Sequence, residues 1–289
     1  MADPTTGNDP RGDPRGDPRA KLRHLGSLAE EEIDLAETAL LLADLDRPGG
    51  DLGRYRHHLS LLTRDTAAAA ALGAADSLDA RAAALRQVLV ERYGYEGDAA
   101  TYDDLQNANL MRVIDRRRGL PVTLGILFLH AARTQGWQAA ALNFPGHFLV
   151  RLELHGERLI LDPFHRGRLC DTRDLRDLLK FALGPEVELG PEHYAEIGNR
   201  GVLLRLQNNI KQRLLQAEDL ERAVAVMEAM LMFAPASPGL WCDLGLTQAK
   251  LGSLRGAILA LDNFLQLGGR DPRRAEVLGL LQQLRRKLN

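Results

Sequence analysis

Cysteine is almost absent from this chain, which has only Cys170 and Cys242 in 289 residues. Two cysteines cannot build the disulfide framework of a small secreted domain, and neither belongs to a Cys-x-x-Cys motif. The sequence also lacks any apolar run of the ~18 residues that a membrane-spanning helix needs. It does not begin with a basic segment followed by an apolar one, as a secretory signal does. These absences predict a cytoplasmic protein with no membrane partner.

The sequence also has no large excess of acidic or basic residues. The chain has 37 basic and 39 acidic residues, and its longest basic block is Arg116-Arg117-Arg118. Nucleic-acid-binding domains usually carry a basic patch, so we expect no nucleic acid partner. Aromatic residues make up only 5% while apolar residues make up 45%. A soluble globular protein with a core of mainly Leu, Ala and Val is therefore expected.

The histidines considered as metal ligands are poorly spaced for that purpose. His57 and His58 are adjacent, so they point in different directions on a helix. Neither they nor His24 have an Asp, Glu, Cys or His four residues further on. We therefore expect no metal site and no cofactor.

The first half of the chain predicts a disordered tail and then helices. Residues 1–20 repeat Asp-Pro-Arg-Gly and have few large apolar side chains, which is typical of disorder. Folded structure is expected near Ser27, where Ser27 and Glu30 form a capping-box pattern. Further helices are predicted at 55–71, from Ser77 to about 92, at 104–117 and at 121–134. Pro121 suits the first turn of the last of these, which is mostly apolar and therefore buried.

A change of period follows, from helical spacing to alternation. Residues 138–144, 148–154 and 158–161 predict antiparallel strands, with a turn at 155–157 and a helix at 171–183. From about Val202 the chain is helical. Ala223 and Ala257 lie 34 residues apart, which is the tetratricopeptide (TPR) period. The TPR consensus residues are matched by Trp241, Leu244, Gly245, Gly252 and Ala257. The fold class is thus α+β, with an all-α C-terminal part.

One region has the layout of a Cys-His-Asp site, in which a helix start faces two strands. A helix begins at Pro121, His147 opens a strand, and Asp162 ends the strand that follows a tight turn. The spacing allows His147 and Asp162 to be neighbours.

Three motifs in this order resemble the SirB-type family of bacterial proteins. They are Arg117-Arg118-Gly119-Leu120-Pro121-Val122-Thr123-Leu124, Pro145-Gly146-His147-Phe148-Leu149-Val150-Arg151 and Leu161-Asp162-Pro163-Phe164, with Asp104, Asn107 and Leu110 before them. The resemblance implies a transglutaminase-like, papain-like core at 21–195 with N-terminal helices, and TPR-like helices at 200–289. By this resemblance, the catalytic His of the wider transglutaminase-like superfamily matches His147, and its catalytic Asp matches Asp162. The Cys position holds Pro121.

Several interpretations of this site remain open. Thr123 is a candidate substitute nucleophile, or its hydroxyl bonds a nearby carbonyl. His147 and Asp162 form a relic or repurposed catalytic pair, or a structural one. The candidate binding residues are Asn107, Arg118, Pro121 and Asn143. We expect a non-catalytic protein that binds a protein or peptide through its TPR-like helices in a regulatory role. The alternative is a hydrolase or acyltransferase that uses Thr123 or water.

Overall fold

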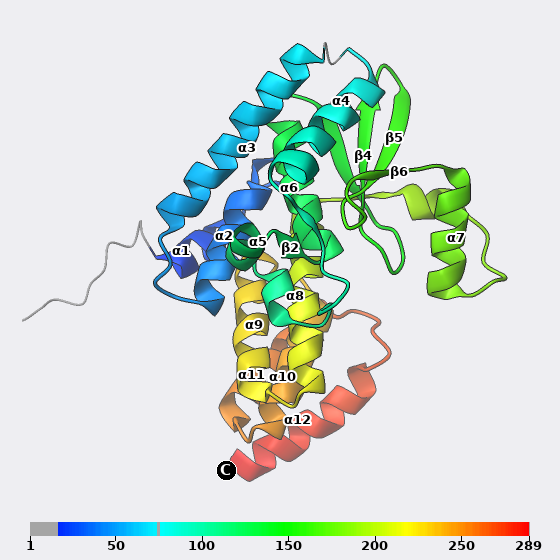
Figure 1. Ribbon diagram of the computed structural model, residues 1–289. Coiled ribbons are helices and arrows are strands. Elements are labelled where there is room, and N and C mark those ends of the chain that lie inside the picture. The colour runs from blue at the N-terminus through cyan, green and yellow to red at the C-terminus, as the bar shows by residue number, and fades with distance from the viewer. Residues whose placement is uncertain (1–16, 74–75, 289) are drawn as a thin grey trace, which may run out of the picture.

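The computed structural model describes residues 17–73 and 76–288, with the helix α6 (Pro121–Arg133) at its centre (Figure 1). Every residue of α6 from Pro121 to Leu129 is buried. The helix packs against the N-terminal helices, the sheet and the first C-terminal helix. A helix that is covered on all sides must be apolar nearly all round. Apart from Thr123, its polar side chains therefore occur only at its end, at His130 and Arg133.

The N-terminal helices cover one side of α6. They are α2 (Leu35–Asp46), α3 (Leu52–Leu72), α4 (Leu78–Leu85) and α5 (Leu110–Arg116). Ser77 caps α4 as predicted, because its hydroxyl oxygen accepts the Ala80 N–H at 3.2 Å, and a π-helical turn continues α4 to Arg92. The helix predicted at 104–117 is two elements. Asp104 caps a short 3₁₀ turn, Leu105–Ala108, and Asn109 caps α5.

Two predictions at the N-terminus were wrong. A helix, α1 (Pro18–Leu25), begins inside the segment expected to be disordered, and Asp17 accepts the Arg19 N–H at its start. Ser27 does not begin a helix; α2 begins only at Leu35, where Asp34 is the cap. The reason is tertiary packing, since α1 contacts α9 of the C-terminal part and buries Leu22 completely. Residues 1–16, which carry most of the predicted tail, lie outside the described residues.

The sheet has five antiparallel strands in the order β6-β5-β4-β3-β7. The predicted strands correspond to β3 (Gln138–Leu142), β4 (Leu149–Leu154) and β5 (Glu157–Asp162). Two short strands, β6 (Arg168–Cys170) and β7 (Glu196–Ile197), were not predicted, because they are too short to show a period. Glu96–Gly97 (β1) and Arg118–Gly119 (β2) form a separate parallel pair.

Both faces of the sheet are covered. Phe148, Val150 and Leu152 belong to the main core that surrounds α6. Leu142 and Leu149 face the other way, into a smaller core with the helix α7 (Thr172–Leu183). The register of β4 against β5 pairs Val150 with Leu161. Asp162, the last residue of β5, therefore lies close to the start of β4 and to the loop that precedes it.

The C-terminal part consists of two helix pairs and a closing helix. They are α8 (Asn199–Gln216), α9 (Leu220–Phe233), α10 (Pro238–Lys250), α11 (Leu254–Leu267) and α12 (Arg274–Leu288). Small residues allow close packing, since a Cβ atom on Gly245 would lie 2.6 Å from the Leu261 side chain. These observations confirm the α+β fold class with an all-α C-terminal part.

The helix α8 joins the two parts. Its Val202 and Leu203 lie in the main core, and neither is exposed. Its Arg200 donates hydrogen bonds to the carbonyls of Leu25, Leu28 and Phe233 and forms an ion pair with Glu30 at 3.1 Å. One side chain thus bonds three carbonyls from two distant segments, which fixes the N-terminal segment against the C-terminal helices.

The contact between α6 and the sheet leaves no room for a side chain at Gly125. A Cβ atom there would lie 2.1 Å from Cε1 and 2.4 Å from Cδ1 of Phe148. We expect Gly125→Ala to lower the free energy of unfolding by ~3 kcal/mol, measured by urea denaturation.

The matched control is Gly279→Ala in α12, where an added Cβ atom has nothing within 4 Å. This variant is expected to be neutral or to gain up to ~1 kcal/mol. The cost of Gly125→Ala should shrink in a Phe148→Leu background. An equal cost in both backgrounds would contradict the proposed steric cause.

Candidate functional site

The start of α6 carries no nucleophile at the position where the transglutaminase-like resemblance places the catalytic Cys. Pro121 is the first residue of the helix and is buried. The missing N–H of proline is harmless there, because the first N–H groups of a helix have no partner within the helix. Burial raises the pKa of the Cys170 thiol to about 11 and also raises the pKa of Cys242. Neither cysteine is therefore a ready thiolate.

Thr123 uses its hydroxyl for structure. The side chain is completely buried, and its Oγ1 donates to the carbonyl oxygen of Asn107 at 2.9 Å. The same carbonyl accepts the Leu120 N–H at 3.0 Å. A hydroxyl has one proton to donate, so the proton of Thr123 is not directed at His147. The bond instead fastens the first turn of α6 to the 3₁₀ turn before α5.

Asn107 is also committed to the scaffold. Its side chain is fully buried, where its amide donates to the Thr101 carbonyl at 2.6 Å and its oxygen accepts from Arg116 at 2.9 Å. Arg116 continues to the buried carboxylate of Asp98 at 2.8 Å. This network closes the loop between β1 and α5, on which the start of α6 rests.

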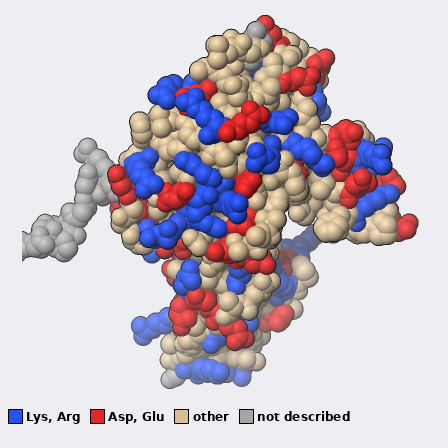
Figure 2. All heavy atoms as spheres, viewed as in Figure 1, with Lys and Arg blue, Asp and Glu red and all other residues tan. Residues whose placement is uncertain are grey.

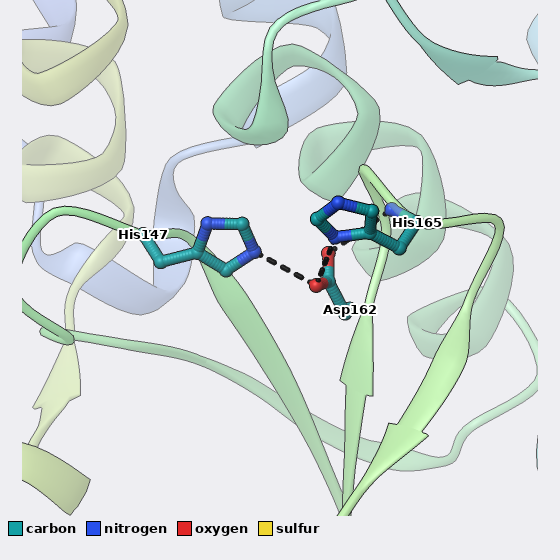
Figure 3. A group of neighbouring side chains, drawn as sticks. All are labelled: His147, Asp162 and His165. Carbon is teal, nitrogen blue, oxygen red and sulfur yellow. Dashed lines mark hydrogen bonds and ion pairs between the residues drawn. The ribbon is translucent and has the colours of Figure 1, made fainter. Parts of the chain in front are cut away.

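His147 and Asp162 are neighbours, and a second histidine joins them (Figure 3). His147 Nε2 lies 2.8 Å from Asp162 Oδ2, and His165 Nδ1 lies 2.6 Å from the same oxygen. The two rings are nearly parallel, at an interplanar angle of 21° with their centroids 5.8 Å apart. Asp162 is completely buried, whereas the His147 side chain is 13% exposed and the His165 side chain 54%.

The Asp162 carboxylate accepts four hydrogen bonds. Its Oδ1 accepts the backbone N–H groups of Phe164 and His165, and its Oδ2 accepts from the two imidazoles. Burial by itself raises the pKa of Asp162, but the hydrogen bonds and charges of His147 and His165 outweigh burial, so the pKa lies below its usual value. An ionised carboxylate only accepts, so each ring nitrogen that faces it carries the proton. In the neutral form of each ring, the other nitrogen, His147 Nδ1 or His165 Nε2, is the acceptor.

The sequence reasoning did not select His165. The available signal was a histidine three residues after an aspartate that begins a turn, a pattern in which the backbone N–H groups at 164 and 165 bond back to Asp162. This geometry brings the His165 ring onto its own turn's carboxylate. It is a weak signal, because the sequence does not show whether the ring at 165 turns toward the carboxylate.

Two helices hold the loop that carries His147. Arg205 of α8 donates to the carbonyls of Phe144 and His147 and lies 5.5 Å from the Phe148 ring centroid. On the other side, Gly146 has a φ of 66°, and a Cβ atom there would lie 2.8 Å from the Ala182 Cβ of α7. The backbone that carries His147 is therefore held by α7 and α8.

The remaining predicted binding residues are not part of this cluster. Arg118 forms an ion pair with Glu96 at 3.0 Å and is half exposed. Asn143 is exposed, and its backbone N–H donates to the Ala195 carbonyl at 2.8 Å. Figure 2 shows Lys and Arg gathered over the region of α5 and β2, with acidic side chains among them. The pair between Arg54 and Asp115, at 2.6 Å, is one example of this local neutralisation.

The larger cavities lie away from this cluster. One of about 620 Å³ is bounded by the segment from Glu30 to Ala36, the end of α6 and β7. Another of about 580 Å³ lies between α9, α10 and α11. Within residues 17–73 and 76–288, none of the helices is both long and apolar enough to cross a membrane.

The buried carboxylate of Asp98 makes the support of α6 dependent on pH. The hydrogen bond from the Thr101 hydroxyl, with further ones from the Thr101 N–H and Arg116, lowers the pKa of Asp98 to about 2 despite burial. The unfolded value is ~3.9. The stabilisation is therefore present above pH ~4 and is lost as the pH falls toward 2. Asp98→Asn is expected to cost ~2 kcal/mol at pH 7 in urea denaturation, and less at pH 3.

Asp103→Asn is the matched control, since the Asp103 side chain in the same loop is 87% exposed. Its cost should stay below ~0.5 kcal/mol at both pH values. A cost of Asp98→Asn that is the same at pH 7 and pH 3 would refute the linkage.

Comparison with known proteins agrees with this architecture. A family model described as the transglutaminase-like superfamily matches residues 54–208, and one described as a tetratricopeptide repeat matches residues 210–282. The chain is 30% identical over 252 residues to a UPF0162 protein of Xylella fastidiosa, which covers 84% of this chain and 87% of that relative. A UPF0162 protein of Vibrio cholerae is also 30% identical, over 85% of this chain and 92% of its own length.

Protein SirB1 of Salmonella typhimurium is 32% identical over 164 residues, which is 56% of this chain and 61% of that relative. Both matched family models occur here in the order that the sequence motifs predicted. The chain therefore belongs to the SirB-type family, in which a transglutaminase-like domain precedes tetratricopeptide repeats.

Proposed function

We propose that this protein acts by binding a protein partner in a regulatory role, and that it forms no acyl-enzyme. The observation that carries this proposal is the residue at the start of α6. Pro121 stands where a thiol would be needed, and the only hydroxyl in that turn, on Thr123, donates to a backbone carbonyl. A covalent intermediate needs an activated nucleophile next to its base. The cytoplasmic location predicted from the sequence suits such a role.

The groove between α9, α10 and α11 supports the binding part of the proposal. Its floor and walls are mostly apolar, and Leu259 on α11 is 65% exposed there. Arg23 of α1 and Glu228 of α9 place opposite charges along it. An amphipathic helix with two or three large apolar anchors and both signs of charge on its flanks fits this pattern. We take such a helix of a protein partner as the occupant.

Leu259 is the position at which to test this interaction. A photo-crosslinking residue at 259 of the full chain should capture a partner that the same residue at Leu278 does not. Leu278 is a fair control, because it is 43% exposed on α12 and does not line the groove. A synthetic peptide with the crosslinked sequence should bind the wild type, and Leu259→Glu should weaken binding ~10-fold or more. Leu278→Glu should bind as the wild type does.

Two results would refute the groove as the binding site. The first is the same crosslinked products from both positions. The second is a peptide whose affinity does not change in Leu259→Glu, measured by isothermal titration calorimetry.

A second candidate function is a hydrolase in which His147 activates water. The hydrogen bond from His147 Nε2 to Asp162 favours it, because this bond orients the ring and leaves Nδ1 as the acceptor. A set of ester, amide and peptide substrates should then reveal turnover that His147→Ala lowers ~100-fold or more. His57→Ala on the exposed face of α3 is the control and should retain full turnover. Equal turnover, or none, in wild type and His147→Ala would exclude this function.

A further inference from the structure

Three side chains with metal-ligating atoms meet at one point beside β4 and β5. The nitrogens His147 Nε2 and His165 Nδ1 both face Asp162 Oδ2, and the three atoms lie within 4.8 Å of one another. The rings approach from different segments, His147 from the loop before β4 and His165 from the turn after β5 (Figure 3). Two imidazoles and one carboxylate are the protein ligands of many zinc and non-haem iron sites.

The carboxylate at this point has only imidazole partners. Asp162 is completely buried, and its ion-pair partners within the described residues are the two histidines alone. Buried charges in proteins are usually paired with an opposite charge or coordinate a metal ion. The same two imidazoles that bond Oδ2 can instead bind a divalent cation placed beside it.

The cluster is accessible and can adjust its spacing. The present nitrogen–oxygen separations of 2.8 and 2.6 Å are hydrogen-bond lengths. Ligand atoms ~2.0–2.1 Å from a tetrahedral Zn²⁺ ion lie about 3.3 Å apart, so each nitrogen must move away from Oδ2 by roughly 0.5–0.7 Å. His165 can provide the larger movement, because its side chain is 54% exposed in a turn. Arg205 holds the backbone of His147, and two N–H groups hold Asp162 Oδ1, so a small rotation of the His147 ring about its fixed backbone provides the other.

We propose that His147, Asp162 and His165 form a binding site for a divalent transition-metal cation such as Zn²⁺. Each imidazole gives up the hydrogen bond to Asp162 and binds the cation through that nitrogen. Its ring proton moves through solvent to the other ring nitrogen, so the exchange between neutral tautomers releases no net proton. Three protein ligands leave a fourth position open to water or to a donor atom of a bound molecule. The sequence had suggested no metal because only His24, His57 and His58 were considered.

Direct titration of the full-length protein tests this site. After removal of metal with a chelator, isothermal titration calorimetry with Zn²⁺ should show one saturable site per chain. His165→Ala should lower the affinity ~100-fold, because it removes one of three ligands. Since His165 is largely exposed, this variant should fold, which circular dichroism would verify. His155→Asn in the exposed turn between β4 and β5 is the matched control, where asparagine tolerates the φ of 51°. It should bind Zn²⁺ as the wild type does.

Co²⁺ provides a second readout that does not depend on activity. Its bound form should show visible d–d absorption, which His165→Ala and Asp162→Asn should both remove. The proposal is overturned if the wild type has no saturable Zn²⁺ site, or if His165→Ala binds Zn²⁺ as tightly as the wild type. Either result would identify the cluster as a hydrogen-bonded unit only. The outcome is independent of the partner groove, since Leu259→Glu should leave the metal affinity unchanged.

Discussion

The complete burial of α6 is the constraint on which the rest of the structure depends. A helix with neighbours on every side cannot shift or tilt without opening the core, so its first turn is fixed in space. Its start is held from outside by the Asn107 carbonyl, which accepts from both Leu120 and Thr123. Proline suits this position because it presets the helical φ and gives up only an N–H group that the helix cannot use. The fold therefore persists without a thiol at Pro121.

The same constraint explains why polar residues before α6 are buried. The loop from Asp98 to Asn107 is exposed over most of its length, but its two end residues are buried and need hydrogen-bond partners. Arg116 satisfies both ends, bonding Asp98 and Asn107. Such a network is stable because its buried donors and acceptors have partners. Asn107, which the sequence suggested as a binding residue, therefore already uses its polar side-chain atoms for hydrogen bonds within the protein.

The His147 site depends on contacts between distant segments. The loop before β4 is held by Arg205 of α8 and lies against Ala182 of α7. The first half of α8 is consequently part of the support of His147, and Arg205 lies within the region that the transglutaminase-like family model matches.

The sequence by itself determined the elements whose signals are local. Apolar periodicity predicted α3 and α6, and Ser77 marked the start of α4. An apolar run predicted β3, alternation followed by a turn predicted β4 and β5, and the 34-residue spacing predicted the C-terminal helices. It also indicated that His147 and Asp162 could meet, since a hairpin sets its register locally.

Only the tertiary structure decided the rest. Pro18 begins a helix because α9 covers Leu22, and the low-complexity composition around it cannot reveal that contact. Thr123 bonds Asn107 because two segments that are separated in the chain meet at the start of α6. His165 joins Asp162 because a turn folds back on its own carboxylate at the end of a strand. Such contacts depend on positions in space, whereas periodicity reports only which face of an element is buried.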